Sequence, residues 1–391
     1  MSIDKRLDCY EMHFNRGEED ALIAEVNEME ANSSWVHDIN SSSMELYGMD
    51  GPMFARGAAD DYHLDYELAL DTADNGTGLL VNTGYSYELV RDTARSSLYE
   101  TAKLNGSALG RMCPTLLSDT LNNGLQVAKG STLMLMRYGK ASALHSNAEG
   151  GYQVMPISEL LRITLSMIHR RFGTGDFIEG YNSHGYTSAI WELPDAQQKI
   201  LDIYAKALLG LGSRYPVNFM PAIRFATSDT AASCATLEPV FYFPKTNAAV
   251  RFVDGVRVRH SKRGKDSAMD VFETEAEDMF ARFEESAEAI KKLASITIYN
   301  GCNAVVSLCN KLGIAKKYGE AARIEMERLT VGGQGVSAHD LYLCMTEALA
   351  EAENSNASNS VIRDLEEKLA KILKADWTEH DVGGVVAWGQ K

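Results

Sequence analysis

The sequence predicts an α+β protein with a mixed or antiparallel β core, one long amphipathic helix and a helical C-terminal part. Strand-like segments gather between residues 176 and 260, apolar residues recur at helical spacing from residue 268 onward, and the first 75 residues show little periodicity. With 391 residues the chain is long enough for more than one packed unit. We expect an acidic, irregular N-terminal arm over 1–75, an α+β core over 76–265 and a helical C-terminal region over 266–391.

The N-terminal arm holds most of the excess negative charge. Residues 1–74 contain 18 Asp and Glu against four Lys and Arg, and the whole chain has a net charge of −16. One helix is expected in the arm, over Glu18–Glu30, where apolar residues recur at helical spacing. The remainder is rich in Asn, Ser and Gly and is expected to wrap around a neighbouring surface, anchored by Trp35, Phe54 and Tyr62.

Helical and strand-like patterns alternate through the first part of the core. Helices are expected over 87–104, 116–125, 158–172 and 195–209, and a buried strand is expected over 132–138. Ser158 is the expected N-cap of the third helix and Gly173 its C-terminal stop. A hairpin of Asp176–Asn182 and Tyr186–Leu193 follows that helix.

The strongest strand signals come next in the chain. They cover Val217–Thr227, Thr236–Phe243 and Ala248–His260, and Gly255 marks a turn or a bulge in the last of them. An apolar stripe from Phe272 to Ile290, with Glu and Lys on the opposite side, then predicts one long amphipathic helix. Shorter helices are expected over 301–312, 316–329, 338–353 and 360–374, followed by a tail that docks Trp377 and Trp388.

Composition indicates in which cellular compartment the protein is expected. The N-terminus lacks the apolar core of a signal peptide, and no apolar run approaches the roughly 18 residues of a membrane span. The six cysteines include no CxxC pair and are interpreted as reduced, mostly buried thiols, so the expected location is the cytoplasm. Cys302 and Cys309 lie seven residues apart on one helix face, where core packing is favoured over metal binding.

Motifs for catalysis do not stand out. The chain lacks GxxxxGK[ST], GxSxG and HExxH patterns. His13, His37, Asp38 and Asp60 imitate the ligand set of metal-dependent phosphohydrolases, but the segment lacks the long helices that such a site needs. We therefore assign no catalytic residue, no metal and no cofactor; the sequence leaves enzymatic activity open and favours a non-enzyme.

A basic segment, Arg251–Lys265, is the main candidate for a binding site. Alternation places Arg257 and Arg259 on one strand face and His260 on the other, and a basic loop follows from residue 261. Such a row of cations can track a phosphate backbone. The candidate residues are Arg251, Arg257, Arg259, His260, Lys262, Arg263 and Lys265. The other interpretation is a solvated strand face, with arginines neutralised by the acidic helix that follows Asp266.

A second basic cluster contains Arg170 and Arg171, at the end of an expected helix. Cations there complement the helix C-terminus, but they gain a binding role if they border the same groove as Arg257 and Arg259. Tyr181, Tyr186 and Trp191 on the predicted hairpin offer stacking surfaces for bases, or else pack across the strands.

The central and C-terminal parts resemble a known family. Four segments carry the likeness, in this order: Phe219–Thr230, Thr236-Leu-Glu-Pro-Val-Phe-Tyr, Val256-Arg-Val-Arg-His260 and the helix from Phe272 to Leu293. Their order is similar to that of the phage/plasmid-like protein family of unknown function, in which a strand pair, a V-x-x-R-H type strand and a long Ala- and Glu-rich helix follow one another. The resemblance covers about residues 150–390, and the acidic N-terminus departs from it.

This resemblance implies a phage-type protein made in a bacterial cytoplasm, and it implies no reaction. By their position in the matching segments, the resemblance implies Arg257, Arg259 and His260 as the candidate site residues. A mixed sheet backed by one long helix is also the layout of single-strand annealing proteins, by analogy of fold alone. The leading hypothesis is a nucleic-acid-binding accessory protein that acts on single-stranded DNA in recombination or replication, as a homo-oligomer without a membrane partner. The alternative is a non-catalytic, self-assembling or host-interaction protein whose acidic arm makes subunit contacts or mimics DNA.

Overall fold

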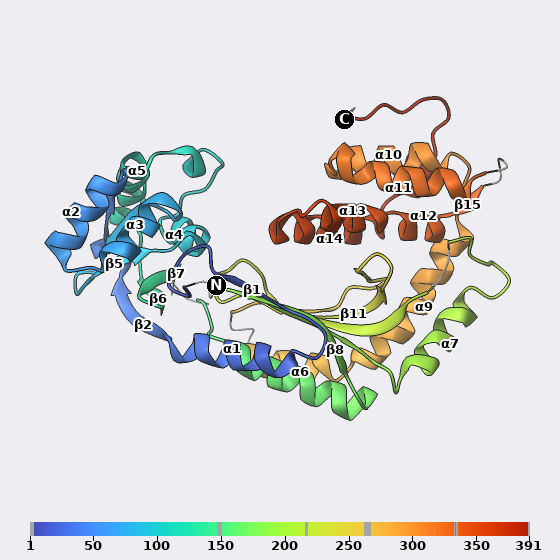
Figure 1. The fold of residues 1–391 in the computed structure, drawn as a ribbon, viewed down its shortest axis with the longest axis horizontal. Helices are drawn as coiled ribbons and strands as arrows, with labels where there is room; N and C mark the ends of the chain where they lie inside the picture. Colours follow the sequence, from blue (N-terminus) through green and yellow to red (C-terminus); the bar gives the residue numbers. More distant parts are fainter. Residues whose placement is uncertain are drawn as a thin grey trace.

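The chain forms a curved molecule with a lobe at each end of a central sheet (Figure 1). This is a computed structural model, and it describes residues 4–146, 151–215, 218–261, 267–331, 333 and 335–389. Helices and mostly antiparallel strands are both abundant in these residues, so the predicted α+β class is confirmed. No helix among the described residues combines the length and apolar character needed to cross a bilayer.

The N-terminal lobe is built on a six-stranded sheet with the order β2-β6-β7-β5-β4-β3. Its strands are β2 (Ser33–Asn40), β3 (Glu45–Gly48), β4 (Leu79–Asn82), β5 (Tyr87–Val90), β6 (Ser131–Arg137) and β7 (Lys140–Ser146). One face packs on α4 (Arg95–Thr101) and α5 (Pro114–Val127), and the other packs on α2 (Pro52–Tyr62) and α3 (Tyr66–Asp74). Strand β4 supplies both cores, because alternate residues Leu79 and Leu80 point to opposite faces.

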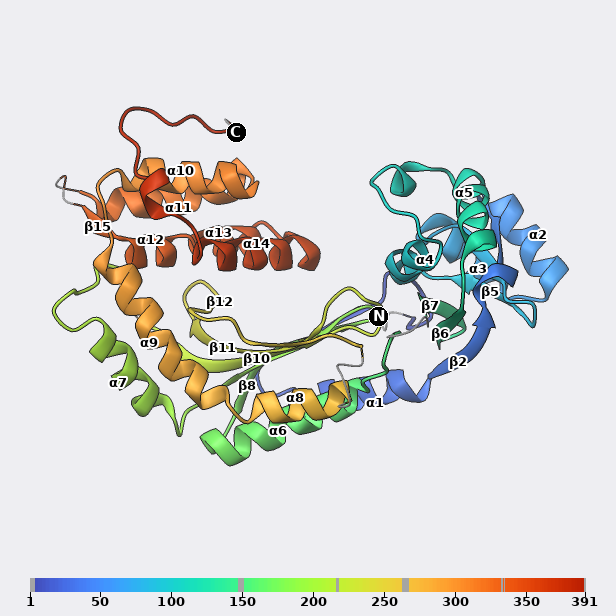
Figure 2. The same ribbon diagram turned by 180° about the vertical axis from the view of Figure 1, so that it is seen from behind.

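A seven-stranded antiparallel sheet forms the centre of the molecule. Its strands are β1 (Glu11–Phe14), β8 (Asp176–Ser183), β9 (Thr187–Glu192), β10 (Met220–Thr227), β11 (Ala235–Phe243) and β12 (Ala248–Val250), with β13 (Val256–Val258) also paired to β11. The outer face is covered by α1 (Glu19–Ala31), α6 (Ile157–Phe172), α7 (Gln197–Ala207), α8 (Ala268–Ala276) and α9 (Met279–Ser295) (Figure 2). Phe225 and Phe241 of the outer face meet Phe272 and Phe283 of these helices.

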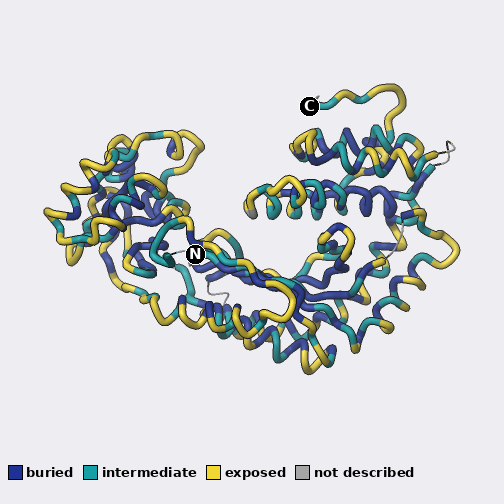
Figure 3. The backbone as a smooth tube through the Cα atoms, in the orientation of Figure 1, coloured by how far each residue is buried: buried dark blue, intermediate teal, exposed yellow. Residues whose placement is uncertain are grey.

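The C-terminal helices lie above the opposite, inner face of this sheet (Figures 1 and 2). They are α10 (Gly301–Leu312), α11 (Lys316–Leu329), α12 (Ala338–Cys344), α13 (Glu347–Asn354) and α14 (Asn359–Ile372), with the two short strands β14 (Thr297–Ile298) and β15 (Val336–Ser337). Helix α12 anchors them, since the Tyr204 hydroxyl lies 2.6 Å from His339 Nε2 and Asp340 accepts from the Tyr215 amide at 3.1 Å. Figure 3 shows buried residues along both the sheet and this layer.

The short 3₁₀ helices lie at connections. They are η1 (Ser41–Ser43), η2 (Asp92–Ala94), η3 (Leu109–Arg111) and η4 (Trp377–Glu379). In the last of them Trp377 is buried in the main core, and Trp388 packs against the same core, so the docking of both tryptophans is confirmed.

Buried ion pairs join the N-terminal segment and the two sheets. Lys140 Nζ lies 2.5 Å from Asp71 Oδ2 and 3.2 Å from Asp8 Oδ2, while Arg137 on β6 lies 2.6 Å from Asp229 Oδ2 beyond β10. Arg91 adds a further contact to Asp8 at 3.4 Å. Because a buried charge left without its partner is costly, this network fixes the N-terminal lobe on the central sheet.

Several predicted elements are confirmed near their expected bounds. They are α1, α5, α6, α7, α10, α11, α14, strand β6, the β8–β9 hairpin and strands β10 and β11. Helix α6 stops at Gly173, which has a φ of +86°. Ser158 is not its N-cap, because the helix begins at Ile157 and the Ser158 hydroxyl donates to Glu30 instead, at 2.5 Å.

The prediction of an irregular N-terminal arm is wrong. Residues 11–74 form strands and helices that enter both sheets: β1 pairs with β8, and β2 pairs with β6. Their partners lie more than 90 residues further along the chain, so local periodicity did not reveal them. Of the expected anchors, Trp35 stacks near Tyr152 and Tyr62 stacks on Tyr87, whereas Phe54 is exposed.

Other differences concern where helices break and which thiols are buried. Residues 87–104 contain strand β5 before the short helix α4, the long helix is split into α8 and α9 around Glu277 and Asp278, and 338–353 is split into α12 and α13. The segment expected over Ala248–His260 forms the two strands β12 and β13, and the break between them ends at Gly255, where a turn or bulge was predicted. All six cysteines are free, but only Cys309 and Cys344 are fully buried.

Candidate nucleic-acid interface

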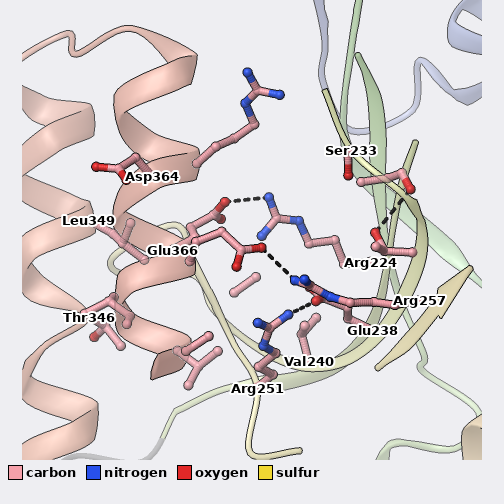
Figure 4. A pocket seen from close by; sticks show the side chains of 18 of the residues that line it. Arg224, Ser233, Glu238, Val240, Arg251, Arg257, Thr346, Leu349, Asp364 and Glu366 are labelled. Atoms are coloured by element: carbon pink, nitrogen blue, oxygen red, sulfur yellow. Dashed lines mark hydrogen bonds and ion pairs between the residues drawn. The ribbon is translucent and has the colours of Figure 1, made fainter. Parts of the chain in front are cut away.

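A cleft separates the inner face of the central sheet from helix α14 (Figure 4). Its central cavity has a volume of about 250 Å³. A second cavity of about 650 Å³ shares Tyr186, Arg224 and Arg363 with it, and a third of about 730 Å³ shares Thr236 and Arg257. The three cavities are therefore neighbours along the inner face of the sheet, and we refer to them together as the cleft.

The floor of the cleft follows from strand alternation in β10 and β11. Phe225 and Leu237 face the outer core, so their neighbours Arg224 and Glu238, which oppose each other across the two strands, face the cleft. Small side chains occupy other floor positions, including Ala226 of β10. The charged residues thus have room to lie above the sheet.

Arginines from the sheet meet carboxylates in this cleft. Arg224 Nη2 lies 2.6 Å from Glu366 Oε2 and Arg257 Nη2 lies 2.7 Å from Glu367 Oε1, both across to α14. Arg251 pairs with Glu238 within the sheet. Figure 4 shows Arg224 and Glu366 pointing toward one another from opposite walls.

Burial affects these guanidinium groups differently. Burial opposes the charged form of Arg224, but its pKa is raised because Glu366 outweighs that penalty. The pKa of Arg251 is lowered, mainly by burial. Arg257 is about half-exposed with a side-chain exposure of 48%, as is its partner at 53%, so this pair is the more easily separated.

An aromatic ring and a further arginine complete the wall. The Arg363 guanidinium of α14 lies 4.1 Å from the centre of the Tyr186 ring, which sits at the turn between β8 and β9. Tyr181 lines the 650 Å³ cavity. Trp191 faces the outer core and is buried, so of the three aromatic residues proposed as stacking surfaces, it alone is placed away from the cleft.

Carboxylates cluster around the 650 Å³ cavity. Glu179 of β8, Glu353 of α13 and Glu366 of α14 all line it. Burial raises the pKa of Glu353 to about 7, with Glu179 and Glu366 contributing through repulsion. Burial also raises the pKa of Glu179. The described residues contain no group of His, Cys, Asp and Glu arranged to hold a metal ion.

Stacked rings border the 730 Å³ cavity where the two sheets meet. His145 of β7 lies 3.6 Å from Tyr152, centre to centre, and Tyr152 lies 5.0 Å from His260. His145 Nε2 is 2.7 Å from the Asp229 carbonyl oxygen, and the Tyr152 hydroxyl is 2.8 Å from His260 Nδ1. Burial lowers the pKa of both histidines to about 4, so they are neutral at pH 7.

The structure brings together part of the predicted basic segment. Arg251 and Arg257 line the central cavity, and the exposed Arg259 lines the neighbouring one. Val256 and Val258 are buried while Arg257 and Arg259 are exposed, as alternation predicts. His260 lines the same neighbouring cavity but is only 8% exposed and stacks on Tyr152, so its nomination as a contact residue stays a prediction. Lys262, Arg263 and Lys265 lie outside the described residues.

The second basic cluster lies elsewhere. Arg170 and Arg171 are on α6, on the outer face of the sheet, and both pair with Glu277. They do not border the cleft described here, so their proposed contact with nucleic acid loses its geometric basis. Glu277 lies in the acidic stretch after Asp266 that was expected to neutralise the basic segment, but Arg251 and Arg257 of that segment pair with Glu238 and Glu367 instead.

Sequence reasoning missed Arg224 and Arg363 as cleft residues. Arg224 interrupts the apolar strand β10 at an inward-facing position, and this lone charge in an apolar strand was a usable signal. Arg363 offered no comparable signal, because a charged residue on an amphipathic helix is ordinary. Comparison with protein-family models, curated proteins and solved structures finds no match to this chain.

Proposed function

We propose that this is a phage-type nucleic-acid-binding accessory protein of the bacterial cytoplasm, which holds single-stranded DNA in the cleft during recombination or replication. One observation supports the proposal most: arginines of three strand segments and of α14 converge on one cleft in a chain whose net charge is −16. They are Arg224, Arg251, Arg257, Arg259 and Arg363. The phage context rests on the family resemblance of residues 150–390.

The chemistry of the cleft suits a sugar–phosphate backbone. Guanidinium groups bind phosphate oxygens in a bidentate manner, and Tyr186 provides a ring at the same wall for stacking. A duplex is read by elements that protrude into its grooves, whereas these arginines lie between the sheet and α14. A single strand, which is thinner and can bend, is therefore the form of nucleic acid that we expect to enter.

The test is binding of a fluorescent single-stranded oligonucleotide, followed by anisotropy at several salt concentrations. Replacing Arg257 and Arg259 together by alanine removes two exposed cations. If each contacts a phosphate, the slope of log affinity against log salt falls by about 1.4, since a single-strand contact contributes roughly 0.7. Affinity at low salt should fall on the order of tenfold, as expected when about 1.4 kcal/mol of binding free energy is lost.

Arg170→Ala with Arg171→Ala is the matched control. It changes the net charge equally but acts on the outer face, so affinity and salt slope should stay close to those of the unmodified protein. Equal losses in both double variants would show general charge attraction and refute the cleft. Light scattering of the same samples reports the expected homo-oligomer. A discrete assembly that is indifferent to oligonucleotide would instead support the self-assembling alternative.

A further inference from the structure

We propose that α14 is a removable acidic cover, whose Glu366 and Glu367 occupy the sheet arginines that phosphates bind when the cover is displaced. This inference rests on the proposed function, because it describes how access to the same cleft is regulated. It explains why Arg224 and Arg257 of the cleft are each held by a carboxylate of α14.

Helix α14 crosses the inner face of the sheet through charged contacts. In chain order, Arg363 lies over Tyr186, Glu366 meets Arg224 of β10 and Glu367 meets Arg257 of β13. At the end of the helix, Lys374 lies 2.7 Å from Asp254, just before β13. The carboxylates thus follow the same path over the arginines that a phosphate backbone would follow.

The apolar side of α14 is directed to the C-terminal layer. Leu365, Leu369 and Ile372 are buried, and the helix packs against α13. Between α14 and the sheet lie cavities of about 250 and 650 Å³, so charged side chains bridge a gap that apolar packing leaves unfilled. Such an interface has little close packing to lose when it opens.

The C-terminal layer is fixed at its opposite end. His339 and Asp340 of α12 are buried and bonded to Tyr204 and to the amide of Tyr215. Helix α13 begins only three residues after α12 ends at Cys344, and α14 follows it across a short turn. Because α13 packs on α11, movement of α11, α13 and α14 together relative to α12 would uncover Arg224 and Arg257 without detaching the layer.

Opening of the cover exchanges one set of ion pairs for another. In the covered state Arg224 and Arg257 each have a carboxylate partner on α14. In the bound state a phosphate oxygen takes that place, and Glu366 and Glu367 become solvated. The half-exposed pair of Arg257 and Glu367 opens at least cost, because an exposed ion pair is weak. The pair of Arg224 and Glu366 is more enclosed, with exposures of 15% and 18%, so it opens second.

The experiment compares oligonucleotide affinity of the full chain with that of Glu366→Gln combined with Glu367→Gln. Glutamine keeps the shape and a hydrogen bond but removes the competing charge, so affinity should rise on the order of tenfold. Glu367→Gln alone, at the half-exposed pair, should raise it by about threefold. This single variant changes only a surface pair, so it keeps the test valid if the double variant is poorly folded.

The charge-matched control is Glu284→Gln with Glu285→Gln, on exposed positions of α9 at the outer face. It should change affinity by less than twofold. Equal gains in the control and in the α14 variants would overturn the cover, since net charge alone would then explain them. Amide hydrogen exchange should also become faster in α14 when oligonucleotide is bound.

The failure of the cover and the failure of the binding function give different results. If the unmodified protein binds oligonucleotide, and Arg257→Ala with Arg259→Ala weakens it, but the Glu366 and Glu367 variants bind no tighter, the cleft stands and the cover is refuted. If neither the unmodified protein nor any glutamine variant binds at low salt, the binding function is refuted, and the cover with it.

Discussion

Replacing His145 by glutamine should make the protein less sensitive to acid. His145 is buried between the two sheets, stacked on Tyr152 and bonded to the Asp229 carbonyl at 2.7 Å. Glutamine can donate a similar hydrogen bond from its amide, but it cannot take up a proton. The substitution therefore removes the titration and the ring contact while retaining a polar partner for Asp229.

The size of the effect follows from the pKa of His145, which burial lowers from 6.5 to about 4. The folded protein keeps this imidazole neutral, whereas the unfolded chain takes up a proton below pH 6.5. Its contribution to stability is thus fully present above pH 6.5 and is lost as the pH falls toward 4. At about 1.4 kcal/mol per pKa unit, the full loss is about 3 kcal/mol, of which about 2 kcal/mol is reached by pH 5.

Other groups titrate in the same window, so the comparison with a variant is needed. Burial also lowers the pKa of His260 to about 4 and that of His184 to about 2, and both act in the same direction as His145. Glu353 acts oppositely: with its pKa raised to about 7, the folded state binds the proton first and gains stability as the pH falls. These contributions cancel when the variant is subtracted from the unmodified protein.

Urea unfolding followed by circular dichroism from pH 7.5 to pH 5 measures the difference. At pH 7.5 the variant should be less stable by about 1 kcal/mol, from the lost stacking on Tyr152. At pH 5 it should be more stable by about 1 kcal/mol, because it escapes the loss of about 2 kcal/mol. His63→Gln, at an exposed position, is the control. Profiles of His145→Gln and unmodified protein that stay parallel over this range would refute the reasoning.

Two further predictions concern stability and are checked by the same urea unfolding at pH 7.5. Lys140→Met leaves the buried carboxylates of Asp8 and Asp71 without their ammonium partner, so the free energy of unfolding should fall by about 3–5 kcal/mol. Lys311→Met, in an exposed pair, should lower it by less than about 1 kcal/mol. Equal losses in the two variants would contradict the structural role of the buried network. Gly57→Ala should stabilise α2 by roughly 0.5–1 kcal/mol because its new methyl group meets open space, while Gly48→Ala should destabilise because the methyl group would collide with the Thr115 backbone. A stable Gly48→Ala protein would show that this close approach is absent in solution.

The sequence predicts best those elements whose signals are local. Helices α10 and α11 lie within a residue of the expected ranges, because Gly313 between them adopts a φ of +66° that few other residues tolerate. Strand alternation correctly separated Arg257 and Arg259 from the buried Val256 and Val258. In each case neighbouring residues carry enough information to fix the backbone or the face.

The contacts between distant segments were not predictable in this way. Arg224 and Glu366 are 142 residues apart, and Arg257 and Glu367 are 110 apart, so no local pattern links them. The expected neutralising carboxylates lay on the helix after Asp266, which is nearer in the chain but packs on the other face of the sheet. The expectation that carboxylates neutralise the arginines of the basic segment is confirmed for Arg251 and Arg257, but the carboxylates are Glu238 and Glu367 and not those of the nearer helix.

The N-terminal segment depends on residues that the ribosome makes much later. Strand β1 pairs with β8, and Glu11 contacts Tyr181, 170 residues further on. At translation rates of about 5–20 residues per second, β1 and the apolar face of α1 wait roughly 10–30 s for their partners. Strand β1 therefore stays unpaired until β8 has been made, and during that interval it presents an open strand edge to the chaperones of the cell.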